Sequence, residues 1–141
     1  MIIGIVGSRR RNEERDFGKL VAKLSQLERE TGREIEKIVT GDCSEGGDKF
    51  ARDIADMFGY EIDVKKIKDP ETGEEMDFKN HRRFEYFTMC SIFYDRNEEI
   101  AKEPLDYLIA LVAPDRKGGT ENTIYWFKRH HPNWEFKLII L

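Results

Sequence analysis

The sequence predicts an α/β protein, a Rossmann-like three-layer α/β/α sandwich with a mainly parallel, five-stranded sheet. Short apolar runs alternate with segments whose apolar residues recur at helical spacing, which is the pattern of strand-helix-strand units. Glycine clusters follow three of the apolar runs, where strands are expected to end. The length of 141 residues suits a single domain over residues 1–141, with no linker or internal repeat.

Five apolar runs, bounded by glycine, proline, aspartate or charged residues, are predicted to be strands that are buried on both faces. They are residues 2–6, 37–40, 60–64, 107–112 and 136–141. Helical segments separate them, and a strand that reaches the next one through a helix makes a right-handed crossover. The strands are therefore expected to be parallel.

Three segments have the apolar periodicity of helices that pack one face against a core. They are residues 13–30, 48–59 and 120–131. In the second segment Met57 and Phe58 are expected to face inward, and Gly59 is expected to end the helix in a left-handed conformation. Thr120 is a candidate N-cap of the third.

The stretch between the third and fourth strands is the least regular part of the chain. Residues 68–75 predict a turn-rich surface loop, and residues 78–104 predict one or two helices, with Asp95 as a candidate cap. Aromatic side chains here could stack on a base, but packing in the core or at a subunit interface is the favoured interpretation. They are Phe84, Tyr86, Phe87, Phe93 and Tyr94. If some of them are exposed, a homodimer is expected.

Charge and cysteine content argue against several classes of function. A formal net charge of −4 disfavours nucleic-acid binding, whose footprint is basic. No apolar run approaches the roughly 20 residues of a membrane span, and no signal-peptide pattern is expected. Cys43 and Cys90 lie far apart, and His130 and His131 are adjacent instead of at ligand spacing. We therefore expect a reduced, cytoplasmic protein without a metal or cofactor.

Three glycine-containing loops are expected to meet at one edge of the sheet. In such sheets, ligands bind beyond the carboxyl ends of the strands, near the point where strand order reverses. Glycine lets the backbone approach an anion closely, and a helix that begins there offers free N–H groups. The candidate ligand-binding residues in these loops are Gly7, Ser8, Arg9, Gly41, Asp42, Gly46, Gly47, Asp48, Gly118, Gly119 and Thr120. Each cluster alone is ordinary turn chemistry, but their joint pattern predicts a phosphate site.

Individual side chains in these loops have more than one interpretation. Arg9 is the first candidate for a phosphate contact, since it follows the first strand and a guanidinium can bind phosphate through two hydrogen bonds. Arg10 and Arg11 are expected to point into solvent. Asp48 either caps its helix, accepts from a ribose hydroxyl or holds its loop. Thr120 and the neighbouring N–H groups predict an anion-binding nest, a role compatible with capping.

Two further candidates lie outside the glycine loops. Arg96 and Asn97 belong to a helix that leads into the fourth strand, which places them near the rim of the expected pocket. Glu121 is interpreted mainly as a first-turn acid that complements the helix dipole. Asp48 and Glu121 are the weak candidates for a catalytic carboxylate.

The motifs GIVGSRR, VTGDCSEGGDKFARDIA, DRNEEIA, LDYLIALV and GGTENTI together resemble the SLOG superfamily. The likeness is strongest to its YspA-like branch, which is related to DprA and to the lonely-guy phosphoribohydrolases, and it covers the chain except residues 69–94. It implies a Rossmann-like fold that binds nucleotides or nucleotide-derived ligands at the strand ends, and homodimers. The elements of that branch fall on Gly7-Ser8-Arg9, Gly46-Gly47-Asp48, Arg96-Asn97 and Gly118-Gly119-Thr120.

The chain departs from the lonely-guy enzymes after its last glycine pair. Those enzymes carry a glutamate pair shortly after the threonine, whereas Asn122 and Thr123 stand in those places here. Glu121 lies one position early, and a helix turns by about 100° per residue, so its side chain is expected to face elsewhere.

Two functions are therefore considered. The first is binding of a nucleotide or nucleotide-derived small molecule, as a sensor or carrier, with the phosphate held at the glycine-rich loops. The alternative is a nucleoside-monophosphate N-glycosidase, in which Arg96 orients the substrate and Asp48 or Glu121 supports positive charge at the anomeric carbon. Binding of single-stranded DNA, as in DprA, is disfavoured by the acidic balance.

Overall fold

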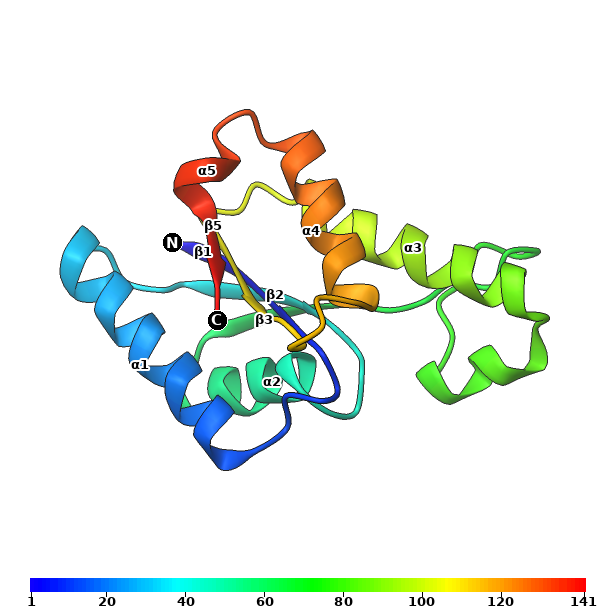
Figure 1. Ribbon diagram of the computed structural model, residues 1–141, viewed down its shortest axis with the longest axis horizontal. Helices are drawn as coiled ribbons and strands as arrows, with labels where there is room; N and C mark the ends of the chain where they lie inside the picture. Colours follow the sequence, from blue (N-terminus) through cyan, green and yellow to red (C-terminus); the bar gives the residue numbers. More distant parts are fainter.

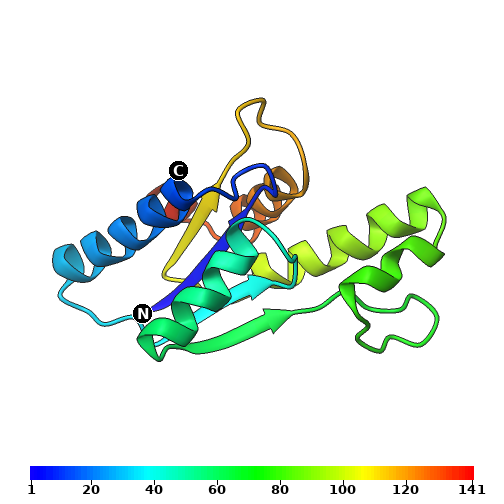
Figure 2. The ribbon, with the colours of Figure 1, turned by 90° about the horizontal axis from the view of Figure 1, so that it is seen from below.

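The computed structural model describes the backbone of residues 1–141 and every side chain except those of residues 81 and 82. A five-stranded sheet, parallel throughout, lies between two layers of helices (Figures 1 and 2). The predicted fold class, a Rossmann-like three-layer α/β/α sandwich, is confirmed. The strands are β1 (Ile2–Gly7), β2 (Lys37–Gly41), β3 (Glu61–Lys65), β4 (Tyr107–Leu111) and β5 (Leu138–Ile140).

The helices follow the predicted segments closely. They are α1 (Glu14–Thr31), α2 (Gly47–Phe58), α3 (Tyr86–Lys102), α4 (Gly119–His130), the short α5 (Trp134–Lys137) and a 3-10 turn η1 (Phe78–Arg83). Gly59 ends α2 with a φ of 73°, which confirms the left-handed end predicted there.

The strands lie in the order β3-β2-β1-β4-β5. The chain builds outward from β1 in one direction through β2 and β3, and then returns to the other side of β1 to add β4 and β5. The switch point of the sheet is therefore between β1 and β4. These two strands pair from Ile3 with Tyr107 to Gly7 with Leu111, so they end at the same level.

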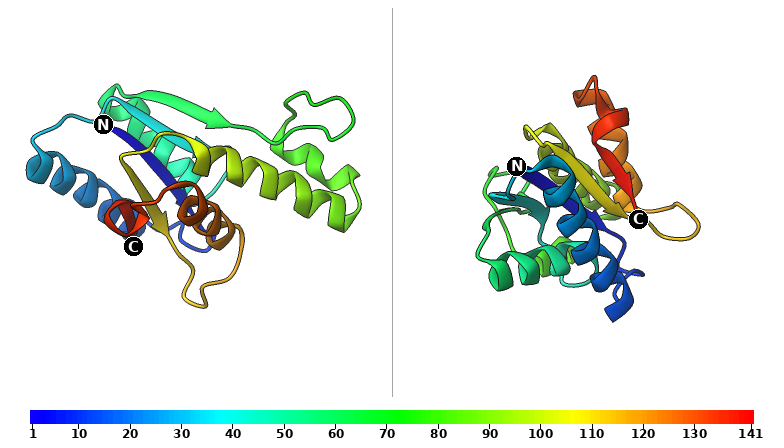
Figure 3. Two further views of the ribbon diagram at one scale, coloured as in Figure 1. Left: turned by 90° about the horizontal axis from the view of Figure 1, so that it is seen from above. Right: turned by 90° about the vertical axis from the view of Figure 1, so that its left-hand side faces the viewer.

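Alternate side chains of each central strand supply two separate cores. Ile3 and Ile5 pack with apolar residues of α1 and α2 on one face of the sheet. Val6 and Val39 pack with α3 and α4 on the other face. Figure 3 shows the same division, with α1 and α2 on one side of the sheet and α3 and α4 opposite.

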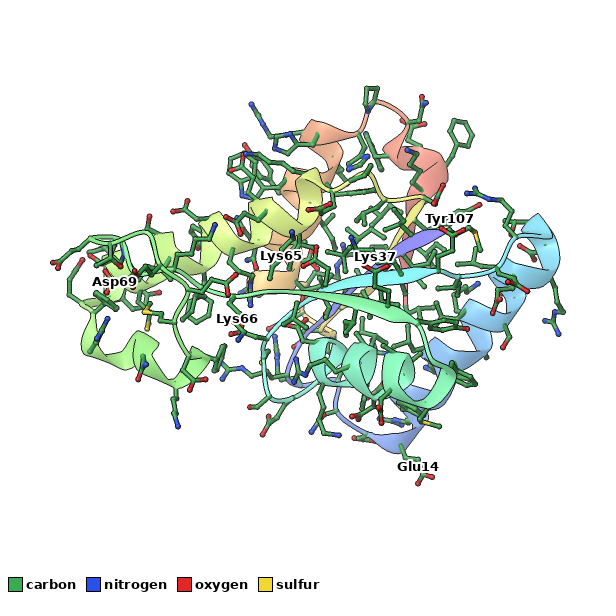
Figure 4. All side chains as sticks on the ribbon, turned by 180° about the vertical axis from the view of Figure 1, so that it is seen from behind. Glu14, Lys37, Lys65, Lys66, Asp69 and Tyr107 are labelled. Atoms are coloured by element: carbon green, nitrogen blue, oxygen red, sulfur yellow. The ribbon has the colours of Figure 1, made fainter. Side chains whose placement is uncertain are left out.

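Burial on both faces was predicted for every strand, and this is wrong for both edge strands. In β5 no residue is fully buried and Ile140 is exposed. The exposure is greater in β3. The strand order places it at the edge, where Glu61 and Ile62 are exposed. Lys65, labelled in Figure 4, forms ion pairs there with Asp63 at 2.9 Å and Glu103 at 2.7 Å. Charged side chains of this kind discourage another strand from pairing with the edge.

Two other local expectations are also wrong. Met57 and Phe58 are exposed, because the buried stripe of α2 ends at Ala55 and its last turn reaches the edge of the sheet. The last strand is shorter than expected, since α5 takes up the first part of the apolar run 136–141.

The largest departure lies between β3 and β4. Residues 66–95, here called the arm, project beyond the end of the sheet (Figures 2 and 3), and Asp69 lies far out on it (Figure 4). Asp95 lies inside the continuous helix α3, so it caps no second helix.

Three aromatic side chains of the arm are exposed instead of packed in the core. The exposed fractions are 67% for Tyr86, 77% for Phe87 and 48% for Tyr94. The core interpretation is therefore wrong for these three residues. Their exposure follows from the position of the arm, because the sheet beneath the second half of α3 does not extend under the first half.

No helix among the described residues is long and apolar enough to cross a membrane.

Candidate functional site

A cavity of about 640 Å³ opens at the carboxyl ends of β1 and β4, at the switch point of the sheet. Its walls are the loop after β1, the loop that leads into α4, and one face of α3. Nine of the thirteen predicted ligand-binding residues line this cavity. They are Gly7, Ser8, Arg9, Asp48, Arg96, Asn97, Gly118, Gly119 and Thr120.

The other four predicted residues lie outside the cavity lining, at the end of β2 or between it and the start of α2. They are Gly41, Asp42, Gly46 and Gly47. The backbone N–H of Gly46 donates to Asn12 Oδ1 at 2.8 Å. A Cβ atom on Gly47 would lie 2.5 Å from the backbone nitrogen of Gly7. Glycine at position 47 therefore permits the start of α2 to pack directly against the end of β1.

A buried ion pair connects α3 to the loop after β2. Arg96 Nη1 donates to Asp42 Oδ1 at 2.8 Å, and Arg96 Nε donates to Asn97 Oδ1 at 3.2 Å. Asp48 lies close by, since a Cβ atom on Gly41 would come 2.4 Å from Asp48 Oδ2 and 2.7 Å from Arg96 Nη1. Gly41 thus leaves the space that the guanidinium and the carboxylate fill.

Asp48 holds the loop after β2, which is one of its three predicted roles. Its carboxylate accepts hydrogen bonds from the Cys43 backbone N–H at 3.2 Å and from Thr40 Oγ1 at 3.4 Å. The capping interpretation is wrong, because Gly46 occupies the N-cap position. Burial raises the pKa of Asp48 above its ordinary value, while the charge of Arg96 opposes the shift.

Asn97 joins α3 to the start of α4. Its Nδ2 donates to the Gly119 carbonyl at 3.3 Å and to Asn122 Oδ1 at 3.2 Å. Three buried side chains line the cavity and are called its floor: Asp48, Arg96 and Asn97.

Thr120 occupies the second position of α4. The N-cap is Gly118, with a φ of 118°, so the predicted capping role of Thr120 is wrong. The Thr120 side chain is only 9% exposed and lines the cavity, and its hydroxyl has no hydrogen bond to any described residue. Around it lie the first N–H groups of the helix, which have no partners within α4 and carry the positive end of its dipole. Free N–H groups and a positive dipole end of this kind are the features that favour an anion at a helix start.

The three consecutive arginines have different surroundings. Arg9 is exposed, lines the cavity and has no hydrogen bond or ion pair with the described side chains. Arg10 also lines the cavity, and about half of its side chain is exposed, but it forms two hydrogen bonds to Asp115 at 2.6 and 3.1 Å. The exposed side chain of Lys117, next to this pair, completes a basic rim. Arg9, Arg10 and Lys117 are called the mouth of the cavity.

The prediction that Arg11 points into solvent is wrong. Arg11 Nε donates to Asp16 Oδ1 at 2.7 Å, and its Nη1 donates to the carbonyls of Val112 and Leu141 at 2.9 Å. Arg11 therefore fastens the last residue of the chain to the end of β4. The sequence shows three consecutive arginines, and it does not show that Arg11 alone has partners in α1, after β4 and at residue 141.

Glu121 lies outside the cavity lining. Both of its carboxylate oxygens accept hydrogen bonds from Arg116, which follows the turn after β4. This arrangement agrees with the role of a first-turn acid and holds the Glu121 carboxylate on Arg116, away from the cavity lining.

Several residues of the cavity were not predicted from the sequence. The additional ones include Cys43, Phe78, Met89, Cys90, Ile100, Lys117 and Thr123. Those on α3 could have been found from their spacing. They lie three or four residues from other cavity residues of α3, and residues so spaced share one face of a helix. Four aromatic side chains form one side of the cavity, here called the aromatic wall: Phe78, Tyr86, Phe93 and Tyr94.

A second cavity, of about 670 Å³, lies against the outer side of α3. Lys66, labelled in Figure 4, and Asp95 belong to its lining, and Arg96 lines both cavities. The side chain of Arg96 therefore helps to separate the two spaces. No three His, Cys, Asp or Glu side chains among those described are grouped to hold a metal ion.

Comparison of the chain with protein-family models finds no matching family, and comparison with curated proteins finds no matching relative.

The raised pKa values of the buried carboxylates predict a pH-dependent stability. Burial raises the pKa of Asp42 and of Asp48, so the folded protein holds these protons more tightly than the unfolded chain. Their contribution to the free energy of unfolding is complete below about pH 3.9, and it is lost as the pH rises through the folded-state pKa values. Asp48→Asn should therefore gain stability relative to the wild type as the pH rises above about pH 4 in urea denaturation.

Asp16→Asn is the matched control. Burial alone would raise the pKa of Asp16, but the hydrogen bond from Arg11 and others lower it overall. The control should therefore be less stable than the wild type by an amount that stays nearly constant above about pH 4 and shrinks as the pH falls below it. If the stability difference from the wild type had the same pH dependence in both variants, the opposite pKa shifts of Asp48 and Asp16 would be wrong.

Proposed function

We propose that this protein binds a nucleotide or a nucleotide-derived small molecule in the cavity at the switch point, as a sensor or carrier. The observation that carries the proposal is the hydroxyl of the largely buried Thr120, which has no hydrogen bond to the described residues and lines the cavity at the open start of α4. Arg9 lines the same cavity without an ion pair. Together they offer a phosphate group hydrogen bonds and positive charge.

The rest of the cavity supports a ligand that is larger than phosphate. Its volume of about 640 Å³ lies in the usual range of small-molecule sites. The floor offers the Asp48 carboxylate as an acceptor for sugar hydroxyls and the Asn97 amide as donor and acceptor. The aromatic wall supplies ring faces on which a base can stack.

We also propose that the chain is a SLOG-type domain of the YspA-like branch. Three of the four sequence elements that carry the resemblance line one cavity, at Gly7-Ser8-Arg9, Arg96-Asn97 and Gly118-Gly119-Thr120. The fourth contributes Asp48 to the floor, while Gly46 and Gly47 lie behind it. This convergence of distant segments supports the resemblance.

Nucleotide binding is tested by thermal unfolding with a panel of mono-, di- and cyclic nucleotides. A ligand at a hundredfold excess over its Kd stabilises the native state by about 2.7 kcal/mol, which raises Tm by roughly 5–15 °C. Arg9→Ala should weaken binding about tenfold or more, and Thr120→Val should weaken it about three- to tenfold.

Arg15→Ala is the control for the loss of an exposed arginine, because Arg15 lies outside the cavity and pairs with Glu13. It should leave nucleotide binding unchanged. The proposal is wrong if no nucleotide raises Tm, or if Arg9→Ala and Arg15→Ala behave alike.

One observation favours the alternative function, a nucleoside-monophosphate N-glycosidase. Asp48 is a carboxylate in the floor, and cleavage of the glycosidic bond develops positive charge on the sugar that such a group stabilises. Arg96 lies beside it and would orient the substrate. Glu121 takes no part in this proposed glycosidase reaction, since it lies outside the cavity lining.

The alternative predicts release of free base from nucleoside 5′-monophosphates, measured by chromatography. Asp48→Asn should reduce the rate by at least about a hundredfold, whereas Glu121→Gln should leave it unchanged. Absence of turnover at high protein concentration would exclude this reaction.

We further propose that the protein forms a homodimer through the arm. The exposed rings of Tyr86, Phe87 and Tyr94 form an apolar surface of the kind that a second copy covers. Sedimentation equilibrium should then give about twice the chain mass of 16.6 kDa. Phe87→Ser should shift the dimer towards monomer, whereas Phe136→Ser, on exposed α5, should not. A wild-type protein of monomeric mass would contradict the proposal.

A further inference from the structure

The mouth of the cavity carries more positive charge than a single phosphate requires. Arg9 and Lys117 line it without ion pairs among the described residues, and Arg10 adds a third cation. They come from two loops that are far apart in sequence, one after β1 and one after β4. A phosphate monoester carries a charge of about −1.5 to −2 at neutral pH, which Arg9 and Lys117 already balance.

Arg10 is held at present by a contact that is easily exchanged. Its guanidinium forms two hydrogen bonds to Asp115, and its Nη2 also donates to the Lys117 carbonyl at 3.4 Å. The side chains of Arg10 and Asp115 are 54% and 46% exposed, and exposed pairs of this kind contribute little to stability. Arg10 can therefore leave Asp115 without disturbing the fold.

The neighbouring arginine shows the opposite arrangement. Arg11 and its partner Asp16 are only 16% and 5% exposed, and Arg11 also donates to two backbone carbonyls. These buried contacts hold the Arg11 side chain in place, so it is not available to a ligand. Of the two arginines that are paired in this loop, only Arg10 is both exposed and part of the cavity lining.

Resting on the proposed nucleotide site, we infer that the preferred ligand carries two linked phosphates, and that Arg10 exchanges Asp115 for the second one. The first phosphate lies at Thr120, the start of α4 and Arg9. A second phosphate attached to it extends past Arg9 to Arg10, which gives it the two hydrogen bonds that Asp115 now accepts. A nucleoside diphosphate or another diphosphate ester has this chemistry, whereas a monophosphate leaves Arg10 on Asp115.

The test uses the full chain in calorimetric titrations with two pairs of probes. Inorganic phosphate is compared with inorganic pyrophosphate, and AMP is compared with ADP, in buffer without divalent metal. In the wild type, each diphosphate should bind at least about tenfold more tightly than its monophosphate partner. Arg10→Ala should reduce this ratio to about threefold or less.

Two variants separate the exchange from a general effect of charge. Arg9→Ala should weaken both members of each pair by a similar factor and so leave the ratio near its wild-type value. Asp115→Asn, which releases Arg10, should keep or increase the ratio. Equal binding of mono- and diphosphates by the wild type, or an unchanged ratio in Arg10→Ala, overturns the inference while the proposed nucleotide site stands. If none of the four probes binds and no nucleotide of the wider panel raises Tm, both the diphosphate inference and the proposed nucleotide site are wrong.

Discussion

The ion pair between Arg96 and Asp42 is the contact on which the cavity depends. It joins the middle of α3 to the loop after β2 across a buried interface. Removing two charges from water is costly, and the attraction between them offsets that cost only when further hydrogen bonds satisfy both groups. Asn97 Oδ1 supplies one such bond to Arg96, and the nearby Asp48 carboxylate adds an opposite charge. Gly41 leaves the space in which these groups meet.

This anchor also explains why α3 has two unlike halves. Its second half packs on the sheet through Ile100 and Ala101 and carries Arg96 and Asn97 into the floor. Its first half lies beyond the sheet as part of the arm, where a contact between Phe78 and Phe93, with ring centroids 5.5 Å apart, joins it to η1. The cavity therefore has a floor fixed by buried charges and a side formed by more exposed rings.

The sequence was sufficient for the fold and for most of the cavity, because both depend on local patterns. Apolar runs with glycines at their ends placed Gly7, Gly118 and Thr120 at one edge of a parallel sheet. The role of Gly47 could not be predicted, since glycine beside a ligand and glycine beside another strand look alike in sequence. Arg11 was misjudged because its partners include the far end of the chain. The arm was misjudged because apolar periodicity does not show where a sheet ends.

The arrangement of charge gives a ligand one orientation in the cavity. Asp48 in the floor and Asp42 behind it both lie beside the single guanidinium of Arg96, so this end does not attract a further anion. At the mouth, Arg9 and Lys117 are unopposed among the described residues, and the dipole of α4 points its positive end the same way. A protein with a net charge of −4 thus concentrates positive potential at one opening. A phosphate ester is therefore held by its charge at the mouth, and its neutral hydroxyl groups meet the acceptors of the floor.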